Sequence, residues 1–407
     1  MTARLTARGG PAVEARVAGI VADASATLRA ALPSSLYRAV LLVGGYGRGE
    51  GGVQVVRGEE RPANNLDVLV VTSALGTVAR GAVKRIADAA LGPVAARAGI
   101  GIDVGVVPAA TVERAPCRVF WYDVRHGHRT LFGDPDWAPS LARFTADAIL
   151  PSDVRDLLVN RATLLVIDDS VLARGRPEGD VRRQVVRHGI KAVIGAGDAL
   201  LFFLGGYHWK NAERQRRMRE RPGVPSDLAA LYDEAMETRF RSDDAPWDAR
   251  DLAAWVDRLR AAARDAHLAV EARRLEKAGL TWEGYPDVAL EAIALEAVRG
   301  GPGRWLRAAA AAARSRGLPG RASRAVEAGW RFATARDRMG LALPVVAYGV
   351  GDSRFRAIAR AAVRARGDSP AALRRGYLGT WGADGDPNFP AAARRLGIDV
   401  EDGGGPG

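Results

Sequence analysis

Hydrophobic and polar positions follow two different periods over the first part of the chain. Apolar residues recur at helical spacing over residues 12–32 and 76–99, and the second of these helices is expected to be interrupted or kinked near Gly92 and Pro93. Short apolar runs with β-branched residues predict buried strands over 37–45, 66–72 and 100–108. A polar excursion between the first two strands predicts a hairpin around Gly58 and Pro62. This order of elements predicts a small α/β domain.

Beyond about residue 150 the strand pattern nearly disappears, and amphipathic helices take over. They are predicted over residues 152–175, 180–208, 250–279, 286–299, 303–316, 320–340, 354–366 and 370–377. Polar connectors that contain proline lie at 218–226 and 240–248. We therefore expect a first domain over residues 1–145, a helical domain over 146–345, and C-terminal helices with a flexible tail over 346–407.

The composition is that of a folded, basic protein. Hydrophobic residues make up 48% of the chain, which is enough for real cores, and the formal net charge is +12. A basic balance suits nucleotides or nucleic acid as partners. The basic residues are nevertheless spread along amphipathic helices, and the densest run, 214–221, is more typical of a solvated helix face than of an RNA contact. Nucleic acid is therefore a possible partner but not the favoured one.

Cysteine content and hydropathy restrict the compartment. The single cysteine, Cys117, excludes an internal disulfide and fits a reducing environment. No apolar run reaches the length of about 20 residues that spans a bilayer. The N-terminal stretch is basic but lacks the continuous apolar segment of a signal peptide. We expect a cytoplasmic protein with no membrane partner.

A glycine-rich stretch, "LLVGGYGRGEGGVQVV" over residues 41–56, follows the first predicted strand. Such a stretch is either a surface loop or a phosphate-binding turn. A P-loop is excluded because no lysine follows the glycines. A kinase loop is excluded because the later kinase motifs are missing. A dinucleotide-binding fingerprint needs an acid at the C-terminal end of the second strand, whereas Asp67 stands at its start.

The remaining pattern resembles the nucleotidyltransferase superfamily, whose fold is that of DNA polymerase β. Val43-Gly44-Gly45 matches its hydrophobic-Gly-Gly motif, and "GYGRGE" matches the continuation of that motif. Asn65-Leu66-Asp67-Val68 stands where two alternating acids belong, and Asp103 fits the third acid. The resemblance covers roughly residues 35–110. It implies an α+β fold with a small mixed-sheet domain followed by a largely α-helical domain. It also implies transfer of a nucleoside monophosphate from a nucleoside triphosphate, with Mg²⁺ or Mn²⁺, to a hydroxyl of a small molecule, protein or RNA.

The resemblance assigns roles to individual residues. Gly44, Gly45, Gly47 and Gly49 would let the backbone approach the phosphates. Asp67 and Asp103 would be metal ligands, and Asp103 or an acid of the helical domain would accept the proton of the attacking hydroxyl. Arg48 would pair either with phosphate or, as we favour, with an acid that orders the turn.

The main departure from the family pattern is Asn65, which replaces the first acid. An asparagine offers a metal only one neutral carbonyl oxygen, so the metal site should be weakened. The alternative function is therefore a catalytically degenerate module that binds nucleotide or a partner. Glu50 would be either a substitute ligand or, as we favour, a solvated loop acid.

Two further elements carry candidate chemistry. In the helical half, Lys191 would contact phosphate and Asp198 would position the acceptor, but with Arg187 they also fit an ion-pair stripe on one helix face. Residues 121–135, "WYDVRHGHRTLFGDP", resemble a strand-turn-strand element of bacterial nucleotidyltransferase-like proteins. The pair His126 and His128 in it is a poor metal site, because no third ligand is near in sequence.

Overall fold

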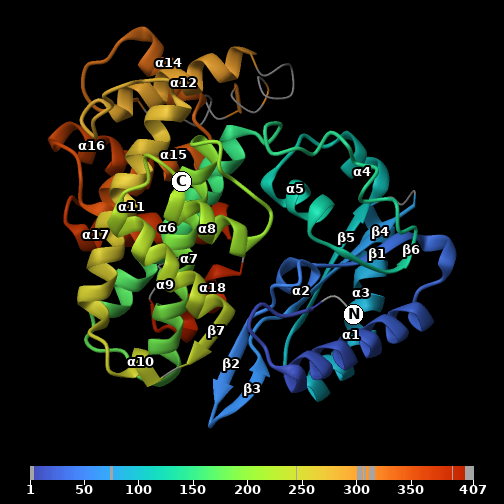
Figure 1. Cartoon of the computed structure of the whole chain (residues 1–407). Coiled ribbons are helices and arrows are strands. Elements are labelled where there is room, and N and C mark those ends of the chain that lie inside the picture. The colour runs from blue at the N-terminus through green and yellow to red at the C-terminus, as the bar shows by residue number, and fades with distance from the viewer. Residues whose placement is uncertain are drawn as a thin grey trace. The chain divides into compact units, whose positions relative to one another are not determined.

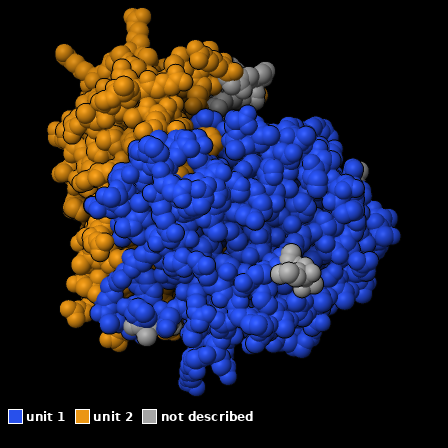
Figure 2. All heavy atoms as spheres, in the orientation of Figure 1, with its two compact units in different colours: residues 1–154, 204–250 blue, residues 155–203, 251–407 orange. Residues whose placement is uncertain are grey.

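The computed structural model describes residues 4–73, 77–243, 245–299, 306, 309, 310, 317–386 and 388–398. The chain forms two compact units, and each is built from two stretches (Figures 1 and 2). Unit 1 comprises Met1–Val154 and Leu204–Arg250, and unit 2 comprises Arg155–Phe203 and Asp251–Gly407. This division differs from the three consecutive segments expected from the sequence. The sequence gives no sign that the chain returns to its first unit after residue 203.

Unit 1 contains a four-stranded mixed sheet in the order β5-β4-β1-β6. Its strands are β1 (Tyr37–Val43), β4 (Leu66–Thr72), β5 (Ile102–Pro108) and β6 (Arg129–Gly133). β1 pairs antiparallel with β4 and β6, whereas β4 pairs parallel with β5. The sheet confirms the strands expected over the first 110 residues and the mixed character of the first domain.

Two long helices cover one face of this sheet. They are α1 (Pro11–Ala31) and α3 (Thr77–Ala98), which lie together beside the sheet (Figure 1). Leu28 of α1 and Leu91 of α3 are buried in one cluster with Val68, Val70 and Val104 of the sheet. Because side chains alternate across a strand, the neighbouring Asp67 and Asp103 point to the opposite face.

A second sheet of three strands has the spatial order β3-β2-β7. The strands β2 (Val53–Val56) and β3 (Glu59–Pro62) form the expected hairpin. Arg57 and Gly58 both have positive φ, 53° and 82°, as a type I′ turn requires. β7 (Arg241–Asp243) comes from the returning stretch and pairs parallel with β2.

Two local expectations for unit 1 need correction. α3 is not interrupted at Gly92, because one helix runs from Thr77 to Ala98 with Pro93 inside it. Residues 121–135 are not strand-turn-strand but a helix, α5 (Val119–His126), followed by β6. The carboxylate of Asp153 accepts a hydrogen bond from the Val119 N–H at 2.9 Å, which satisfies an otherwise unpaired donor at the start of α5.

The remaining helices of unit 1 connect or extend these layers. They are α2 (Gly44–Gly47), α4 (Ala109–Arg114), α8 (Asn211–Glu220), α9 (Ser226–Phe240) and α10 (Ala245–Asp248).

Unit 2 is helical, which confirms a largely helical region after the mixed sheets (Figure 1). Its helices are α6 (Pro151–Leu172), which begins in unit 1, α7 (Gly179–Phe203), α11 (Leu252–Arg274), α12 (Tyr285–Arg299), α14 (Arg324–Phe332), α15 (Ala335–Tyr348), α16 (Ser353–Ala362), α17 (Pro370–Thr380) and α18 (Phe389–Arg395). The helix expected over 303–316 lies for the most part outside the described residues. The helix expected over 320–340 is two helices, because Thr334 forms a capping box with Asp337 and starts α15 there. No helix among the residues described here is long and apolar enough to cross a membrane.

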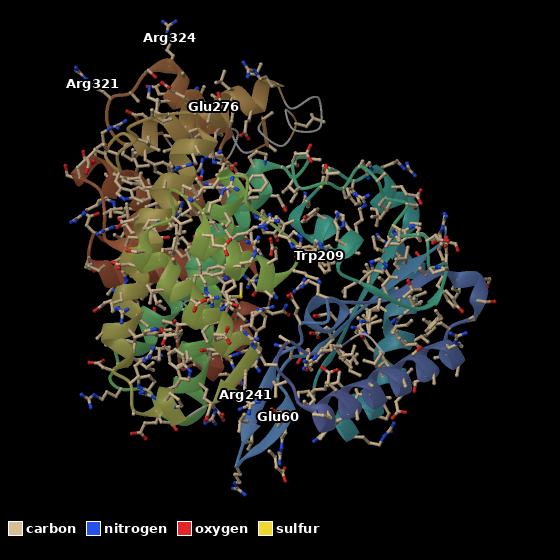
Figure 3. The ribbon with its side chains drawn as sticks, in the orientation of Figure 1. Glu60, Trp209, Arg241, Glu276, Arg321 and Arg324 are labelled. Carbon is tan, nitrogen blue, oxygen red and sulfur yellow. The ribbon has the colours of Figure 1, made fainter. Side chains whose placement is uncertain are left out.

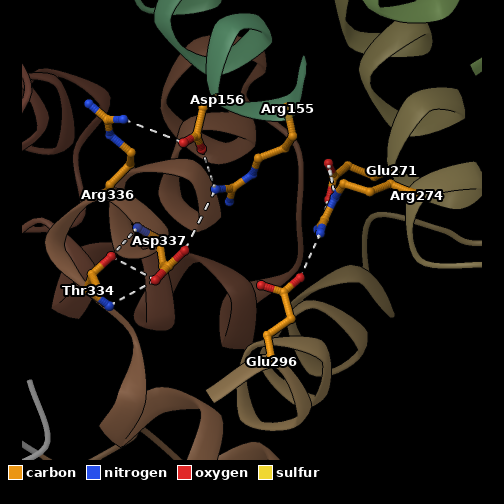
Figure 4. Close-up of polar contacts among 8 residues, drawn as sticks. All are labelled: Arg155, Asp156, Glu271, Arg274, Glu296, Thr334, Arg336 and Asp337. Carbon is orange, nitrogen blue, oxygen red and sulfur yellow. Dashed lines mark hydrogen bonds and ion pairs between the residues drawn. The ribbon is translucent and has the colours of Figure 1, made fainter. Parts of the chain in front are cut away.

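The core of unit 2 contains an ionic cluster between its helices (Figure 4). Glu271 is fully buried and accepts two hydrogen bonds from the Arg274 guanidinium, at 3.0 and 2.7 Å. Arg155 is buried as well, and its Nη1 lies 3.5 Å from Asp156 and 4.0 Å from Asp337. Although burial opposes ionisation, the charges of Arg274 and Arg155 lower the pKa of Glu271 to about 2. The buried carboxylate of Glu271 therefore offsets the charge of Arg274, and together with Asp156 and Asp337 it offsets that of Arg155.

Replacing this carboxylate should destabilise unit 2 strongly. Glu271→Gln keeps the shape of the side chain but removes the buried carboxylate charge that pairs with Arg274 and also favours the charged form of Arg155. We expect a loss of about 3 kcal/mol in the free energy of unfolding, measured by thermal and urea denaturation. The control is Asp265→Asn on the same helix, where an exposed carboxylate pairs with Arg264 and should contribute less than about 1 kcal/mol. Equal effects of the two variants would contradict this account of the core.

Candidate functional site

The glycine-rich stretch forms a tight turn from β1 into α2. Gly44 has φ +66°, and a Cβ at this position would overlap the carboxylate of Asp67. At Gly47 a Cβ would come within 2.5 Å of the Leu42 carbonyl oxygen, and at Gly49 within 2.6 Å of the Arg4 carbonyl oxygen. At Gly45 a Cβ would meet only ordinary contacts. Close approach to the protein's own atoms therefore accounts for Gly44, Gly47 and Gly49, and Gly45 has room around it.

Asp67 and Asp103 are direct neighbours across the parallel strands β4 and β5. Residues in register on such a pair point to the same side, so both carboxylates stand on the face opposite α1 and α3. Val43, the last residue of β1, is the partner of Asp67 on the other side. The structure thus brings the glycine turn and the two acids together at one end of three adjacent strands.

Asn65 joins the same group. It stands two residues before Asp67, and its Nδ2 donates a hydrogen bond of 3.0 Å to Asp103 Oδ2. A Cβ at Gly101 would come within 2.8 Å of the Asn65 side-chain amide, which shows how closely this amide lies against the start of β5. Three of the expected ligands, Asn65, Asp67 and Asp103, therefore lie together.

The electrostatics of Asp67 differ from those of an ordinary surface carboxylate. Burial raises its pKa to about 6, and the neighbouring charge of Asp103 acts in the same direction. The positive charges of Arg48 and Arg239 oppose this rise in the pKa of Asp67. A metal cation bound here would favour the ionised form of Asp67.

Arg239 is a residue of this site that the sequence did not reveal. It lies on α9, and its carbonyl oxygen packs against Gly52, directly after the glycine turn. Only the return of residues 204–250 to unit 1 brings Arg239 to Asp67. No local motif marks it, so it could not be distinguished from the other arginines of the helical half.

Glu50 has a structural role that neither expectation foresaw. It is buried, and its carboxylate accepts hydrogen bonds from the N–H groups of Asn211 and Ala212 at 2.8 and 3.0 Å. These are the first residues of α8, so Glu50 caps that helix and complements its dipole. It is neither a solvated loop acid nor available as a metal ligand, since both oxygens hold α8.

Arg48 belongs to the same buried network. Its side chain is about 10% exposed, with Nε 3.9 Å from Glu50 and Nη1 3.5 Å from Asp123 of α5. Asp123 in turn accepts a hydrogen bond from the Tyr207 hydroxyl at 3.2 Å. These contacts support the favoured role of Arg48, that of ordering the turn.

Lys191 and Asp198 lie on α7 of unit 2, whereas the turn and the two acids lie in unit 1. Lys191 is exposed, whereas Asp198 is buried near Arg161 of α6. Burial lowers the pKa of Arg161, and the charge of Asp198 opposes this. The stem of Arg161 packs against Gly195, one turn before Asp198. Because Asp198 is buried whereas Arg187 and Lys191 are exposed, the expected ion-pair stripe on one face of the helix is not what the structure has.

The donor set fits one small, hard cation. Within the described ranges no three His, Cys, Asp or Glu residues gather into a metal-binding group. Two carboxylates and an amide oxygen are nevertheless suitable Mg²⁺ ligands, because Mg²⁺ is often held by one or two carboxylates together with water and substrate phosphates. The partial burial of Asp67 beside Asp103, with only Arg48 and Arg239 to offset the two charges, also favours a cation at this point.

Comparison with known proteins adds no assignment. No model of a protein family matches the chain, and no curated protein matches it significantly.

The ionised form of Asp67 is unfavourable in the folded protein. We therefore predict that removing its charge stabilises the protein, and that the size of this effect depends on pH. The pKa of Asp67 is raised to about 6 in the folded protein, so the folded state binds its proton more tightly than the unfolded chain does. Stability is therefore lost as the pH rises from about 4 through about 6. Asp67→Asn should raise the free energy of unfolding by about 1–2 kcal/mol at pH 8, and by much less near pH 4.5.

The measurement is urea denaturation at both pH values without divalent metal. Asp23→Asn, an exposed acid on α1, is the matched control and should change stability at neither pH. A loss of stability in Asp67→Asn at pH 8 would contradict the account.

Proposed function

We propose that this protein is a Mg²⁺-dependent nucleotidyltransferase, which moves a nucleoside monophosphate from a nucleoside triphosphate to a hydroxyl of an acceptor. The observation that carries the proposal is the pairing of Asp67 with Asp103 in register, with the Asp67 carboxylate against the backbone of Gly44. The mixed sheet with β4 between β1 and β5 is consistent with the nucleotidyltransferase-like domain expected from the glycine motif. Cys117 is buried and its pKa is raised by burial, so this thiol has no part in the proposal.

Asp67 and Asp103 would hold the metal, with the carbonyl oxygen of Asn65 as a third ligand. When bound, Mg²⁺ would neutralise phosphate charge during in-line transfer. Mn²⁺ could serve as well, because it accepts the same oxygen ligands.

The protein's own residues supply positioning and proton transfer. The positive charges of Arg48 and Arg239 lie near Asp67 and would offset part of the negative charge that the triphosphate brings to the turn. In the reaction, the acceptor oxygen bonds to the α-phosphorus, the bond to pyrophosphate breaks, and the hydroxyl proton leaves. Asp103 is exposed and can accept this proton. Two roles in unit 2 stay predictions: Lys191 would contact a phosphate, and Asp198 would position the acceptor. We still expect the protein in the cytoplasm, because nucleoside triphosphates are abundant there.

The direct test is transfer of label from nucleoside triphosphates. The purified protein is incubated with each α-labelled triphosphate, Mg²⁺ or Mn²⁺, and a cell extract that supplies acceptors. We expect a labelled product with one or more nucleotides, and a loss of at least about 100-fold in Asp67→Ala and Asp103→Ala, because each removes a charged metal ligand. Asp23→Asn is the control. Absence of product, together with unchanged nucleotide binding in Asp67→Ala, would refute the proposal.

A second function is favoured by one specific contact. The Asn65 amide donates to Asp103 and so occupies, with a neutral N–H group, a carboxylate oxygen that a metal would otherwise hold. Such a hydrogen bond is expected in a degenerate module that binds nucleotide or a partner but does not catalyse transfer.

Restoring the missing acid separates the two functions. Asn65→Asp places a third carboxylate beside Asp103, so it should raise Mg²⁺ affinity, measured by calorimetry. If it also raises transfer by tenfold or more, the natural site is disabled and the degenerate module is the correct function. If it lowers transfer, Asn65 is adapted to a working site. Asn64→Asp, one residue earlier, is the control, because Asn64 Oδ1 accepts its hydrogen bond from the Gly52 N–H of the turn.

A further inference from the structure

Three aromatic rings form a surface cluster on unit 1, outside the metal site. Trp209 lies on the loop before α8 (Figure 3), and its indole is half-buried. The imidazole of His126, at the end of α5, lies nearly parallel to it with centroids 6.5 Å apart and planes at 17°. The imidazole of His208 is also nearly parallel, at 5.6 Å and 27°. At these centroid distances the stacks are offset, so neither imidazole covers the whole indole face.

This aromatic cluster is held next to the glycine turn. Gly127 follows His126, and a Cβ there would overlap the Arg48 side chain and come within 2.9 Å of Trp209 Cε3. The carbonyl oxygen of Gly127 also faces Gly47, at 3.1 Å from where its Cβ would stand. Arg48 and Trp209 therefore both pack against Gly127. Because Arg48 directly follows Gly47 of the turn, the indole lies next to the turn.

Several contacts fix the orientation of the indole. The Tyr122 hydroxyl hydrogen-bonds the Trp209 backbone, and the Tyr122 ring packs against His126. The Lys210 ammonium lies 5.1 Å from the centroid of the indole. An oriented, partly exposed ring of this kind is what stacking on a planar ligand requires, because little side-chain entropy remains to be lost.

The two histidines are suited to the same purpose. Burial lowers the pKa of both His126 and His208, with Arg125 and Arg217 acting in the same direction. The neutral form of each ring is therefore favoured and presents uncharged aromatic surface, while the Lys210 ammonium lies over the indole, 5.1 Å from its centroid.

We propose that Trp209, flanked by His126 and His208, is the surface on which the base of the nucleoside triphosphate stacks. The proposal rests on the proposed function, because it takes the turn beside Arg48 as the place of the phosphates. The large indole favours a purine over a pyrimidine, since stacking strength grows with the area of overlap. The ligand class is thus a purine nucleoside triphosphate.

The test compares ligands with and without a base. Calorimetry measures binding of a non-hydrolysable ATP analogue, a non-hydrolysable UTP analogue and inorganic tripolyphosphate, each with Mg²⁺. The wild type should bind the ATP analogue more tightly than the UTP analogue, and tripolyphosphate least tightly. Trp209→Ala should weaken binding of the ATP analogue about tenfold and leave tripolyphosphate binding unchanged. Trp209→Phe should recover most of the loss.

A control variant separates stacking from a folding defect. Trp121→Ala removes a second half-buried indole, on the same helix as His126, which packs against Phe144 rather than at the turn. It should leave all three affinities unchanged. The inference is overturned if Trp209→Ala leaves binding of the ATP analogue unchanged, or weakens tripolyphosphate equally. If the wild type binds tripolyphosphate as tightly as the ATP analogue, the aromatic cluster is not the base site but the proposed function stands. If the wild type binds none of the three ligands, both fall.

Discussion

The contact between Gly44 and the carboxylate of Asp67 constrains the rest of the site. The antiparallel pairing of β1 with β4 places Val43 opposite Asp67, so the chain must turn away at once after β1. It does so with a positive φ at Gly44, where a side chain would collide with the carboxylate. Any larger residue there would push the turn away from β4. The close approach buries Asp67, and burial raises its pKa. It also leaves Asp67 and Asp103 side by side, where the charge of Asp103 opposes ionisation of Asp67.

Residues 204–250, which return to unit 1, hold the residues of this turn in place. Residues 204–250 bring the start of α8 onto Glu50, and they bring Tyr207 onto Asp123, which pairs with Arg48. They also bring Arg239 toward Asp67. The carboxylates of Glu50 and Asp123 hold the start of α8 and the side chain of Arg48 in place. Asp67 and Asp103 have different surroundings, because they face each other across β4 and β5, and Asp103 accepts a hydrogen bond from the Asn65 amide.

Sequence patterns were sufficient for the parts of the site that depend on neighbouring residues. The alternation in "LDVLVV" placed Asp67 on the strand β4, and the run around Asp103 placed it on β5, so their common side followed from strand geometry. The strand order and the return of residues 204–250 depend on packing between distant segments, which no local pattern records. For this reason the capping role of Glu50 and the presence of Arg239 were missed. The helix at 119–126 was missed because its start is stabilised by Asp153, more than 30 residues away in sequence.

The central claim is that Asp67 and Asp103 hold a divalent cation at the turn after β1. The most direct measurement is anomalous diffraction from crystals grown with Mn²⁺ and a non-hydrolysable nucleoside triphosphate, since Mn²⁺ substitutes for Mg²⁺ and scatters anomalously. The account predicts an anomalous peak bonded to carboxylate oxygens of both aspartates, with the triphosphate against the turn that begins at Gly44. A metal and nucleotide bound elsewhere, with the two carboxylates free of metal, would contradict it.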